Sequence, residues 1–366
     1  MRDRPDAAED LSALTLSCIS GITREQVDDL TRAFGTLCDA LRASEVELVR
    51  AGLPAEQAAR VVRGEGRVES ERAVETCERL GVRWLLPHHH DWPQVVEGVH
   101  PRPLVLYLRG FLPSAAVAVV GSRRADLYGL RFARQLGRDL ARAGHCVVSG
   151  GALGIDAAAH RGALESGASQ PTLAVLGCGI DVVSPPRHRE LFAALAREGA
   201  LLSEFSPGAP PYPGNFPQRN RLIAALSSAV VVVRAARRSG SLVTARWARH
   251  LGIPLLATPG PAGDTLSEGT HELLRSGASI CATVEDVLLS IGRSEAPPSP
   301  PSSEVAGADL DRQAVRLLEL LSRSPAGLDE LGMEAGMESW QAAAYMTRLE
   351  LMGFAERRGS GFVRLN

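Results

Sequence analysis

The chain has 366 residues, which is enough for two or three domains. Hydrophobic residues make up 45% and charged residues 22%, proportions typical of a globular protein. No apolar run approaches the roughly 20 residues that span a bilayer, so a transmembrane protein is excluded and no membrane partner is expected.

The net charge of −2 conceals a local asymmetry. The chain contains no lysine, so its basic side chains are arginines, the type best suited to bidentate contact with phosphate. Between Glu204 and Asp264 there is no acidic residue. This acid-free block predicts an anionic partner. Its basic residues are Arg219, Arg221, Arg234, Arg237, Arg238, Arg246, Arg249 and His250.

The cysteines are scattered and include no CxxC pair, which predicts reduced core residues rather than disulfides or zinc ligands. The N-terminus, MRDRPDAAED, is charged and lacks the apolar core of a signal peptide. Both features predict a cytoplasmic protein.

In chain order, residues 1–10 are predicted to be a disordered tail and residues 11–83 a helical domain. Helices are expected over residues 11–19, 24–34, 44–51 and 55–63. The turn Ile19–Ile22 is similar to a helix-hairpin-helix turn, which clamps DNA phosphates. A plain helical turn is favoured, because the acidic residues that follow repel phosphate.

Residues 84–112 are predicted to be a connector with a strand over residues 104–108. The connector contains His88, His89 and His90. Successive side chains point apart, so we predict no metal site at these histidines.

The rest of the predicted domain, up to residue 292, alternates apolar strands with helical patterns, which indicates a doubly wound α/β sheet. The expected strands are 117–120, 146–149, 173–176, 201–203, 230–234 and 254–257, with a short one at 279–282. Residues 293–307 are a predicted Pro/Ser linker. Residues 308–366 follow the winged-helix order, with helices at 309–321, 328–335 and 339–352 before a hairpin.

The stretch from Val117 to Asp156 organises the α/β domain. It contains two strands that each end in a glycine loop, Gly121-Ser122-Arg123 and Ser149-Gly150-Gly151. Parallel strands bring such loops to one edge of the sheet, where ligands bind. The spacing fits neither a dinucleotide fingerprint nor a Walker loop, so we predict phosphate binding without NAD, ATP or another cofactor.

Several residues around these loops are candidates for binding the anion. Asp156 is predicted to satisfy the free N–H groups where its helix begins, and His160 is either a structural histidine or a phosphate contact. Arg219, Asn220 and Arg221 fall in the first turn after Pro217, where the helix dipole favours anions. Ser239, Gly240 and Ser241 precede another helix and repeat the anion-binding pattern, with Arg237 and Arg238 beside them. Several such loops along one edge predict a polyanion.

These motifs together resemble the DNA-processing protein A family (DprA, also called Smf). The resemblance covers about residues 85–285 and rests on motifs that occur in the family's order: Trp92-Pro93, Gly121–Arg123, Ser149–His160, Ala174–Gly179, Ser203–Phe205, Phe216–Arg221 and Ser239–Thr244.

The resemblance implies an extended Rossmann-like domain that binds single-stranded DNA, flanked by an N-terminal helical domain (SAM or helix-hairpin-helix-like) and a C-terminal winged helix. It also implies a homodimer through the Rossmann-like domain and a mediator that protects incoming DNA and loads the RecA recombinase during natural transformation. No catalytic activity is implied. The DNA contacts that it implies are Gly121, Ser122, Arg123, Ser149, Gly150, Gly154, Asp156, Arg219, Asn220, Arg221, Ser239, Gly240 and Ser241.

Two positions depart from the family pattern. Leu153 stands where arginine is usual and removes an expected phosphate contact, while Arg234 stands where glutamate is usual and adds a positive charge near the same edge. Arg237 or Arg238 is expected to compensate.

Two alternatives remain. One is a phosphoribohydrolase-like enzyme of the same superfamily, although the loop Ser239–Thr244 lacks the acid that such enzymes use. The other is a protein adaptor that acts through the outer domains, because the last predicted helix is not basic.

Overall fold

The structure is a computed structural model that describes residues 7–292 continuously. Of the remainder it describes 317, 320–321, 327–337, 341–343, 345–346, 349, 355–358 and 361–364. The chain divides into two compact units, Met1–Glu295 and Ala296–Asn366. The predicted linker at 293–307 lies outside the described residues. No helix in the described part of the chain is both long enough and apolar enough to cross a membrane.

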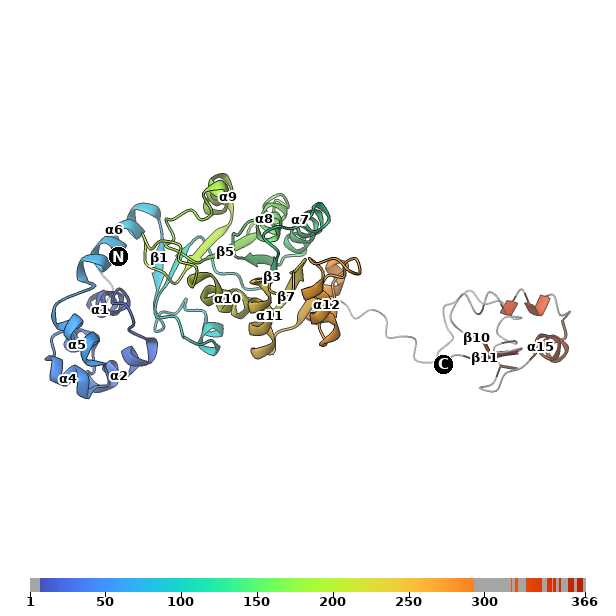
Figure 1. The fold of residues 1–366 in the computed structure, drawn as a ribbon, viewed down its shortest axis with the longest axis horizontal. Coiled ribbons are helices and arrows are strands. Elements are labelled where there is room, and N and C mark those ends of the chain that lie inside the picture. Colours follow the sequence, from blue (N-terminus) through green and yellow to red (C-terminus); the bar gives the residue numbers. More distant parts are fainter. Residues whose placement is uncertain are drawn as a thin grey trace. The chain divides into compact units, whose positions relative to one another are not determined.

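The first unit begins with six helices (Figure 1). Helix α2 shows why they form where they do: Thr23 and Gln26 make a reciprocal capping box at its start, and Gly35 ends it with φ 82°. The other helices of this segment are α1 (Ala7–Ser17), α3 (Leu37–Ala40), α4 (Glu45–Arg50), α5 (Ala55–Val62) and α6 (Arg67–Leu80).

The structure corrects the predicted N-terminal boundaries. Helix α1 begins at Ala7, so residues 7–10 are helical rather than part of a disordered tail. Helices α3 and α6 were not predicted. A strand that was not predicted, β1 (Arg83–Leu85), crosses the expected boundary between residues 83 and 84. The strand predicted at 104–108 is present as β2 (Leu106–Arg109), which joins the sheet beside β6.

The predicted α/β fold is confirmed as a nine-stranded sheet in the order β1-β2-β6-β5-β4-β3-β7-β8-β9. The strands from β6 to β9 in this order run parallel, and β1 and β2 are antiparallel additions at one edge. The bounds are β3 (Ala116–Gly121), β4 (Cys146–Ser149), β5 (Thr172–Leu176), β6 (Ala200–Ser203), β7 (Ala229–Val233), β8 (Leu255–Ala257) and β9 (Ser279–Ile280).

Helices cover both faces of this sheet (Figure 1). Alternate residues of β3 enter two different clusters: Val117 and Val119 pack with α7 and α8, whereas Ala118 and Val120 pack with α10 and α11. The covering elements are α7 (Leu127–Arg142), α8 (Ile155–Leu164), α9 (Arg189–Glu198), α10 (Asn215–Ala225), α11 (Ser241–His250), α12 (Glu268–Arg275) and α13 (Val284–Ser290), with short turns η1 (Gln94–Gly98) and η2 (Pro186–His188).

One apolar cluster joins the N-terminal helices to the sheet. Leu14 of α1 and Leu30 of α2 belong to the same buried cluster as Tyr107 of β2 and Leu176 of β5. The acidic residues of α2 contribute to this junction, because Arg102 contacts Glu25 at 3.1 Å and Asp28 at 3.0 Å. The predicted helical domain is therefore part of the same compact unit as the sheet.

The turn at Ile19–Ile22 lies between α1 and α2. Its Ser20 carbonyl accepts a hydrogen bond from Arg60 and its Gly21 carbonyl accepts one from Gln57. These contacts hold the turn against α5.

The second unit contains α15 (Leu328–Ala335) and an antiparallel hairpin of β10 (Ala355–Arg358) and β11 (Gly361–Arg364). Leu331, Met346, Leu349 and Phe362 share its buried core. Helix α15 has the predicted bounds. The helices predicted at 309–321 and 339–352 lie mostly outside the described residues.

Candidate nucleic-acid interface

A cavity of about 690 Å³ lies where the strand order reverses, between β3 and β7. Loops that follow β3, β4 and β7 line it together with the first turn of α10, as the glycine loops predicted. The predicted residues that line it are Gly121, Ser122, Arg123, Asp156, Arg219, Asn220, Arg238, Ser239, Gly240 and Ser241. Ser149, Gly150, Gly154, His160, Arg221 and Arg237 are not among its lining residues.

The loop after β3 leaves its arginines exposed. A Cβ atom at Gly121 would lie 1.8 Å from the Val233 carbonyl oxygen, so only glycine fits between β3 and β7. Ser122 donates its N–H to the Arg234 carbonyl at 2.7 Å, which fixes the loop. Arg123 and Arg124 extend into solvent, and the Arg123 guanidinium lies 5.2 Å from the centre of the Phe216 ring. These cations are free to meet an anion.

Backbone N–H groups of the loop after β4 are hydrogen-bonded to a side chain of the protein itself. The Asp156 carboxylate accepts the N–H groups of Gly150 at 3.1 Å and Ala152 at 3.3 Å. Burial raises the pKa of Asp156, while the Arg219 charge and these two N–H donors oppose the rise. The Asp156 carboxylate therefore accepts N–H groups of the loop that precedes α8, and not those of the first helical turn as predicted. These N–H groups are not free for phosphate.

Arg219 faces inward beneath this loop. Its guanidinium donates to the carbonyl oxygens of Gly150, at 2.8 Å, and Val175. Only 3% of the residue is exposed, and burial lowers its pKa to about 10. Arg219 therefore sits at the floor of the cavity, where it supports the loop and contributes positive potential.

Arg221 points away from the cavity. Both of its terminal nitrogens lie 2.6 Å from the Glu204 carboxylate, and its Nε donates to the Pro101 carbonyl. The side chains of this pair are 1% and 8% exposed. Because a phosphate cannot reach this guanidinium without breaking the pair, the structure does not support the predicted contact at Arg221.

His160, which the sequence left open, is a buried structural residue. Thr172 donates its hydroxyl to the Val147 carbonyl at 2.6 Å, so it accepts from His160 Nδ1–H, also at 2.6 Å. Burial lowers the pKa of His160 to about 3. The ring is neutral at physiological pH and does not reach the cavity.

The loop after β7 brings hydroxyl groups to the cavity. The Ser239 and Ser241 hydroxyls contact each other at 2.8 Å, and Asn220 donates to the Gly240 carbonyl at 3.2 Å, which ties α10 to the start of α11. Arg237 and Arg238 are both exposed, but only Arg238 is among the lining residues. This loop supplies one cation and two hydroxyls to the site.

The two departures from the family pattern have different outcomes. Arg234 does not add a free positive charge: it is 2% exposed, contacts Asp126 at 2.8 Å and also pairs with Asp264. It adopts the left-handed backbone, with φ 53°. Leu153 is exposed and does not line the cavity.

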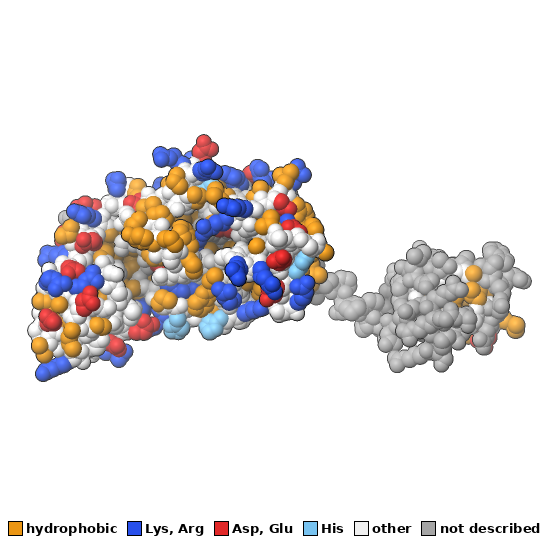
Figure 2. Space-filling model, viewed as in Figure 1, with side chains coloured by type: hydrophobic (Ala, Val, Ile, Leu, Met, Phe, Trp, Pro, Cys, Tyr) orange, Lys and Arg blue, Asp and Glu red, His pale blue; other side chains and the backbone are white. Residues whose placement is uncertain are grey.

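The positive charge of the acid-free block is therefore partly neutralised in the structure. The two acids at its ends, Glu204 and Asp264, fold back onto Arg221 and Arg234. On the face shown in Figure 2, basic side chains gather over the α11–α12 region with a few acidic ones among them, and the two kinds are also mixed over the N-terminal helices.

Two polar lining residues, Arg124 and Thr244, were not among the predicted contacts. Arg124 is exposed beside Arg123, and the double arginine was a usable signal. The Thr244 hydroxyl is buried and has no hydrogen-bond partner among the described residues. Thr244 ends the Ser239–Thr244 motif, so the motif was a usable signal for this residue as well.

Chemically, the cavity offers donors rather than metal ligands. Asp156 is the one carboxylate among its lining residues in the described part of the chain, and it already accepts two backbone N–H groups. Guanidinium and hydroxyl groups surround it. This arrangement suits a phosphate-bearing ligand.

Comparisons with known proteins agree with this fold. The family model for DNA recombination-mediator protein A matches residues 83–292, and the DprA winged helix domain matches residues 295–361. A Mycobacterium tuberculosis protein named as a DNA processing protein DprA is 37% identical over 345 residues, which cover 85% of this chain and 87% of that protein.

Two solved structures extend the likeness to three dimensions. DNA processing protein A from Streptococcus pneumoniae aligns with a TM-score of 0.66 and 28% identity, covering 77% of this chain and 97% of that one. DNA processing protein A from Helicobacter pylori, whose single-stranded DNA binding mode was studied, aligns with a TM-score of 0.52 and 31% identity, covering 58% and 96%. The predicted family and the C-terminal winged helix are confirmed, and the chain belongs to the DNA recombination-mediator protein A (DprA/Smf) family.

Proposed function

We propose that this protein binds single-stranded DNA without chemically altering it and acts as a recombination mediator. The observation that carries the proposal is a group of solvent-facing donors around the cavity. This rim set consists of Arg123, Arg124, Arg238 and Ser239, which come from two loops at the switch point of the sheet. Cations and hydroxyls so arranged bind phosphates.

The binding mode follows from the positions of these groups. Arg123 and Arg238 pair with successive phosphates, and the Ser239 and Ser241 hydroxyls turn from each other to the phosphate oxygens. The Thr244 hydroxyl, which has no hydrogen-bond partner among the described residues, offers one more hydrogen bond. Phosphate contacts carry no base information, so binding depends weakly on sequence and strongly on salt.

A single strand fits this site better than a duplex. The cavity is concave and Phe216 forms part of its wall, so an unstacked base can contact the ring while its phosphate meets Arg123. The likeness to the Helicobacter pylori protein, which binds single-stranded DNA, supports the same choice.

The enzymatic alternative has less support. A phosphoribohydrolase needs a carboxylate beside the phosphate loop, and the one among the described lining residues, Asp156, already accepts the N–H groups of Gly150 and Ala152. Release of ribose 5-phosphate from nucleoside monophosphates would restore this alternative.

The proposal includes a biological role. The protein protects incoming DNA and loads RecA during natural transformation, in the cytoplasm. Family membership supports this role, and the cysteines, which are free, agree with a reducing compartment. The proposed homodimer uses the Rossmann-like domain, where the short edge strand β9 exposes Ile280.

The test is fluorescence anisotropy with a labelled 20-nucleotide oligothymidine, with and without its complement, over a range of salt concentrations. We expect the single strand to bind at least tenfold more tightly than the duplex, with a linear log–log salt dependence. Equal affinities, or affinity independent of salt, would contradict the proposal. RecA-dependent strand exchange on DNA coated with single-strand-binding protein tests the loading step, and sedimentation equilibrium tests the dimer.

A further inference from the structure

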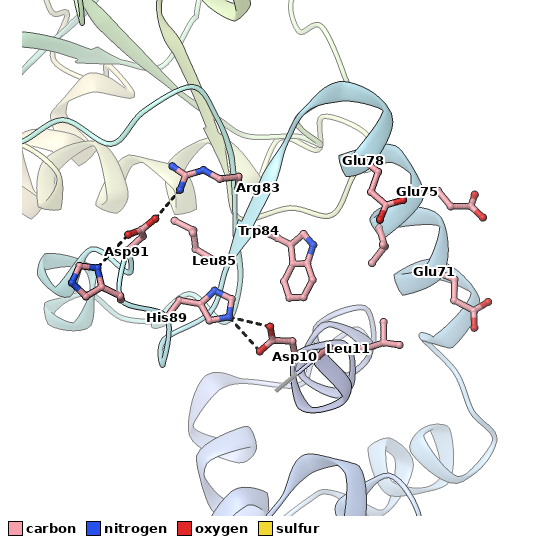
Figure 3. A pocket seen from close by; sticks show the side chains of 13 residues that line it. Asp10, Leu11, Glu71, Glu75, Glu78, Arg83, Trp84, Leu85, His89 and Asp91 are labelled. Carbon is pink, nitrogen blue, oxygen red and sulfur yellow. Dashed lines mark hydrogen bonds and ion pairs between the residues drawn. The ribbon is translucent and has the colours of Figure 1, made fainter. Parts of the chain in front are cut away.

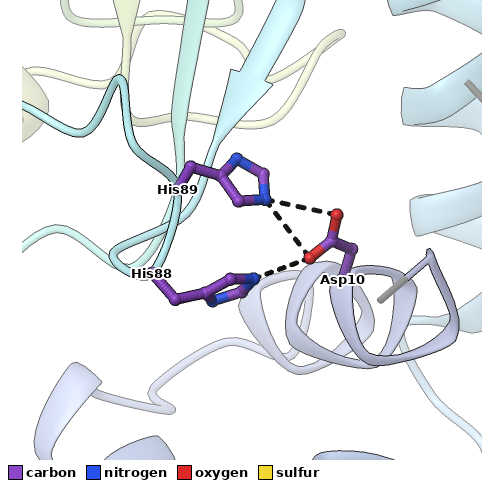
Figure 4. A group of neighbouring side chains, drawn as sticks. All are labelled: Asp10, His88 and His89. Carbon is purple, nitrogen blue, oxygen red and sulfur yellow. Dashed lines mark hydrogen bonds and ion pairs between the residues drawn. The ribbon is translucent and has the colours of Figure 1, made fainter. Parts of the chain in front are cut away.

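Two of the three consecutive histidines converge on one carboxylate outside the DNA site. His88 Nε2 lies 2.8 Å from Asp10 Oδ1, and His89 Nε2 lies 3.2 Å from each Asp10 oxygen (Figure 4). Asp10 belongs to α1, and the histidines follow β1. The ligand atoms of the three residues all lie within 4.8 Å of one another.

This geometry corrects the argument that adjacent histidines point apart. The backbone turns sharply after β1, because His89 donates its N–H to the Leu86 carbonyl at 2.9 Å. The turn brings the rings of His88 and His89 together edge to face, with their centroids 4.7 Å apart. Only His90 points elsewhere, toward Asp91.

We propose that Asp10, His88 and His89 bind a zinc ion. Two imidazole nitrogens and one carboxylate oxygen form a typical zinc ligand set, and bonds of about 2.1 Å place tetrahedral ligands roughly 3.4 Å apart, near the separations from Asp10 seen here. The Asp10 side chain is 5% exposed, and its ion-pair partners among the described residues are these two imidazoles. A divalent cation would neutralise this buried charge.

Exposure leaves room for a further ligand. The His89 side chain is 11% exposed, but that of His88 is 48% exposed, so the cluster opens to solvent on one side. A water molecule can complete the coordination there. Imidazole ligands favour zinc over magnesium or calcium, which prefer oxygen.

An acidic groove leads to the same residues. Asp10 and His89 line a groove of about 760 Å³ together with Glu71, Glu75 and Glu78, which project from α6 (Figure 3). The one arginine of this lining, Arg83, is bound to Asp91 at 2.7 Å. The excess of carboxylates attracts cations toward the cluster.

Binding has an identifiable cost. Leu86 donates its N–H to His89 Nδ1 at 3.3 Å, so the proton of the metal-free ring is on Nε2. Zinc at Nε2 requires the proton to move to Nδ1, which breaks this long hydrogen bond. The gain is a cross-link between α1 and the segment after β1, which stabilises the packing of the N-terminal helices on the sheet.

The experiment uses full-length protein without a polyhistidine tag, stripped with EDTA and dialysed against micromolar Zn²⁺. Metal content is measured by mass spectrometry and thermal unfolding by calorimetry. We expect one zinc ion per chain and a Tm raised by several degrees, with no such effect from Mg²⁺. His88→Gln and His89→Gln should lose both effects.

His90→Gln is the matched control, because the His90 side chain is fully exposed and lies beside the cluster without joining it. It should bind zinc like the wild type. Absence of stoichiometric zinc in the wild type, or its retention in both His88→Gln and His89→Gln, would overturn the proposal. His88 is half-exposed, so its variant is expected to fold even if that of His89 does not. DNA affinity should not depend on zinc.

Discussion

Polar side chains of the same kinds are exposed at the rim of the cavity and buried in the protein around it, and they have different roles in the two places. The rim set defined above faces solvent. A second, buried set is held by other parts of the protein: Asp156, His160, Arg219, Arg221 and Arg234. Each set includes residues that the sequence predicts to bind phosphate, such as Arg123 in the first set and Arg219 in the second. What separates them is whether each charge already has a partner.

This comparison teaches that a motif can be required for binding without touching the ligand. Arg219 and Asp156 hold the loop after β4 from opposite sides, through its carbonyl and its N–H groups. Arg221 and Arg234 connect distant segments through Glu204 and Asp126. The buried set fixes the shape of the edge, and the rim set makes the contacts.

The largest expected effect is on stability, at Arg221. Arg221→Ala leaves the Glu204 carboxylate buried without its partner, which should cost about 3–5 kcal/mol of unfolding free energy. Urea unfolding measures the loss. The double variant Arg221→Met with Glu204→Gln removes both charges and should recover most of it. A stable Arg221→Ala protein with weakened DNA binding would move Arg221 into the rim set.

The second effect is the pH dependence of the unfolding free energy that results from burial of His160. Its pKa is lowered to about 3 from an ordinary 6.5, so its stabilising contribution is complete above pH 6.5 and is lost as the pH falls toward 3. At pH 5 the loss is about 2 kcal/mol. His160→Gln should reduce the acid destabilisation by that amount.

The ring itself can be followed directly. The NMR signal of His160 should not titrate above pH 4, because burial lowers the pKa of this ring to about 3. Titration of His160 near pH 6 would show that the ring is accessible to solvent, as a phosphate contact would be.

The third effect is on DNA affinity, at the rim. Arg123→Ala and Arg238→Ala should each weaken single-strand binding about tenfold and reduce the salt slope by about 0.7, as expected for one lost phosphate contact. Unfolding free energy should change by less than about 0.5 kcal/mol, because both side chains are exposed. If these variants lost unfolding free energy but kept their affinity for single-stranded DNA, Arg123 and Arg238 would belong with the buried, structural set instead.

The smallest effect distinguishes neighbours within one loop. Arg237 is exposed like Arg238 but does not line the cavity. Arg237→Ala should therefore change affinity less than about threefold, through long-range attraction alone. Equal effects at the two positions would mean that the DNA path extends beyond the cavity.

Much of the sheet could be predicted because its strands are short apolar runs that end in glycine or polar loops. The strand β4 has the predicted bounds, and the predicted strand from Val117 to Val120 lies within β3. The loops after these strands also meet at one edge as expected, because parallel strands place their carboxyl ends together. Local pattern was enough for these features.

The orientation of the arginines could not be predicted in the same way. Arg219 and Arg221 were assigned to the first turn after Pro217, but α10 begins earlier, at Asn215. Some of the buried arginines also have partners that are distant in the sequence: Arg219 donates to the Gly150 carbonyl, and Arg234 donates to the Asp126 carboxylate. Only tertiary contacts decide which guanidinium is buried.

Three elements of the N-terminal segment, α3, α6 and β1, were not predicted, for a related reason. Helix α6 is rich in charged residues and has few apolar ones, so its pattern is weak, and α3 has only four residues. Strand β1 is three residues long at a sheet edge. Such elements form because neighbours pack against them.

The apolar cluster shared by the N-terminal helices and the sheet has a consequence for folding. Leu14 and Leu30 are buried in the same cluster as Tyr107 and Leu176, so separating the helices from the sheet would expose apolar side chains of both layers. Residues 7–292 should therefore unfold in a single cooperative transition, with the slowest-exchanging amides of α1 protected about as strongly as those of β5. A fragment that starts at the sheet would carry a bare apolar face and would tend to aggregate.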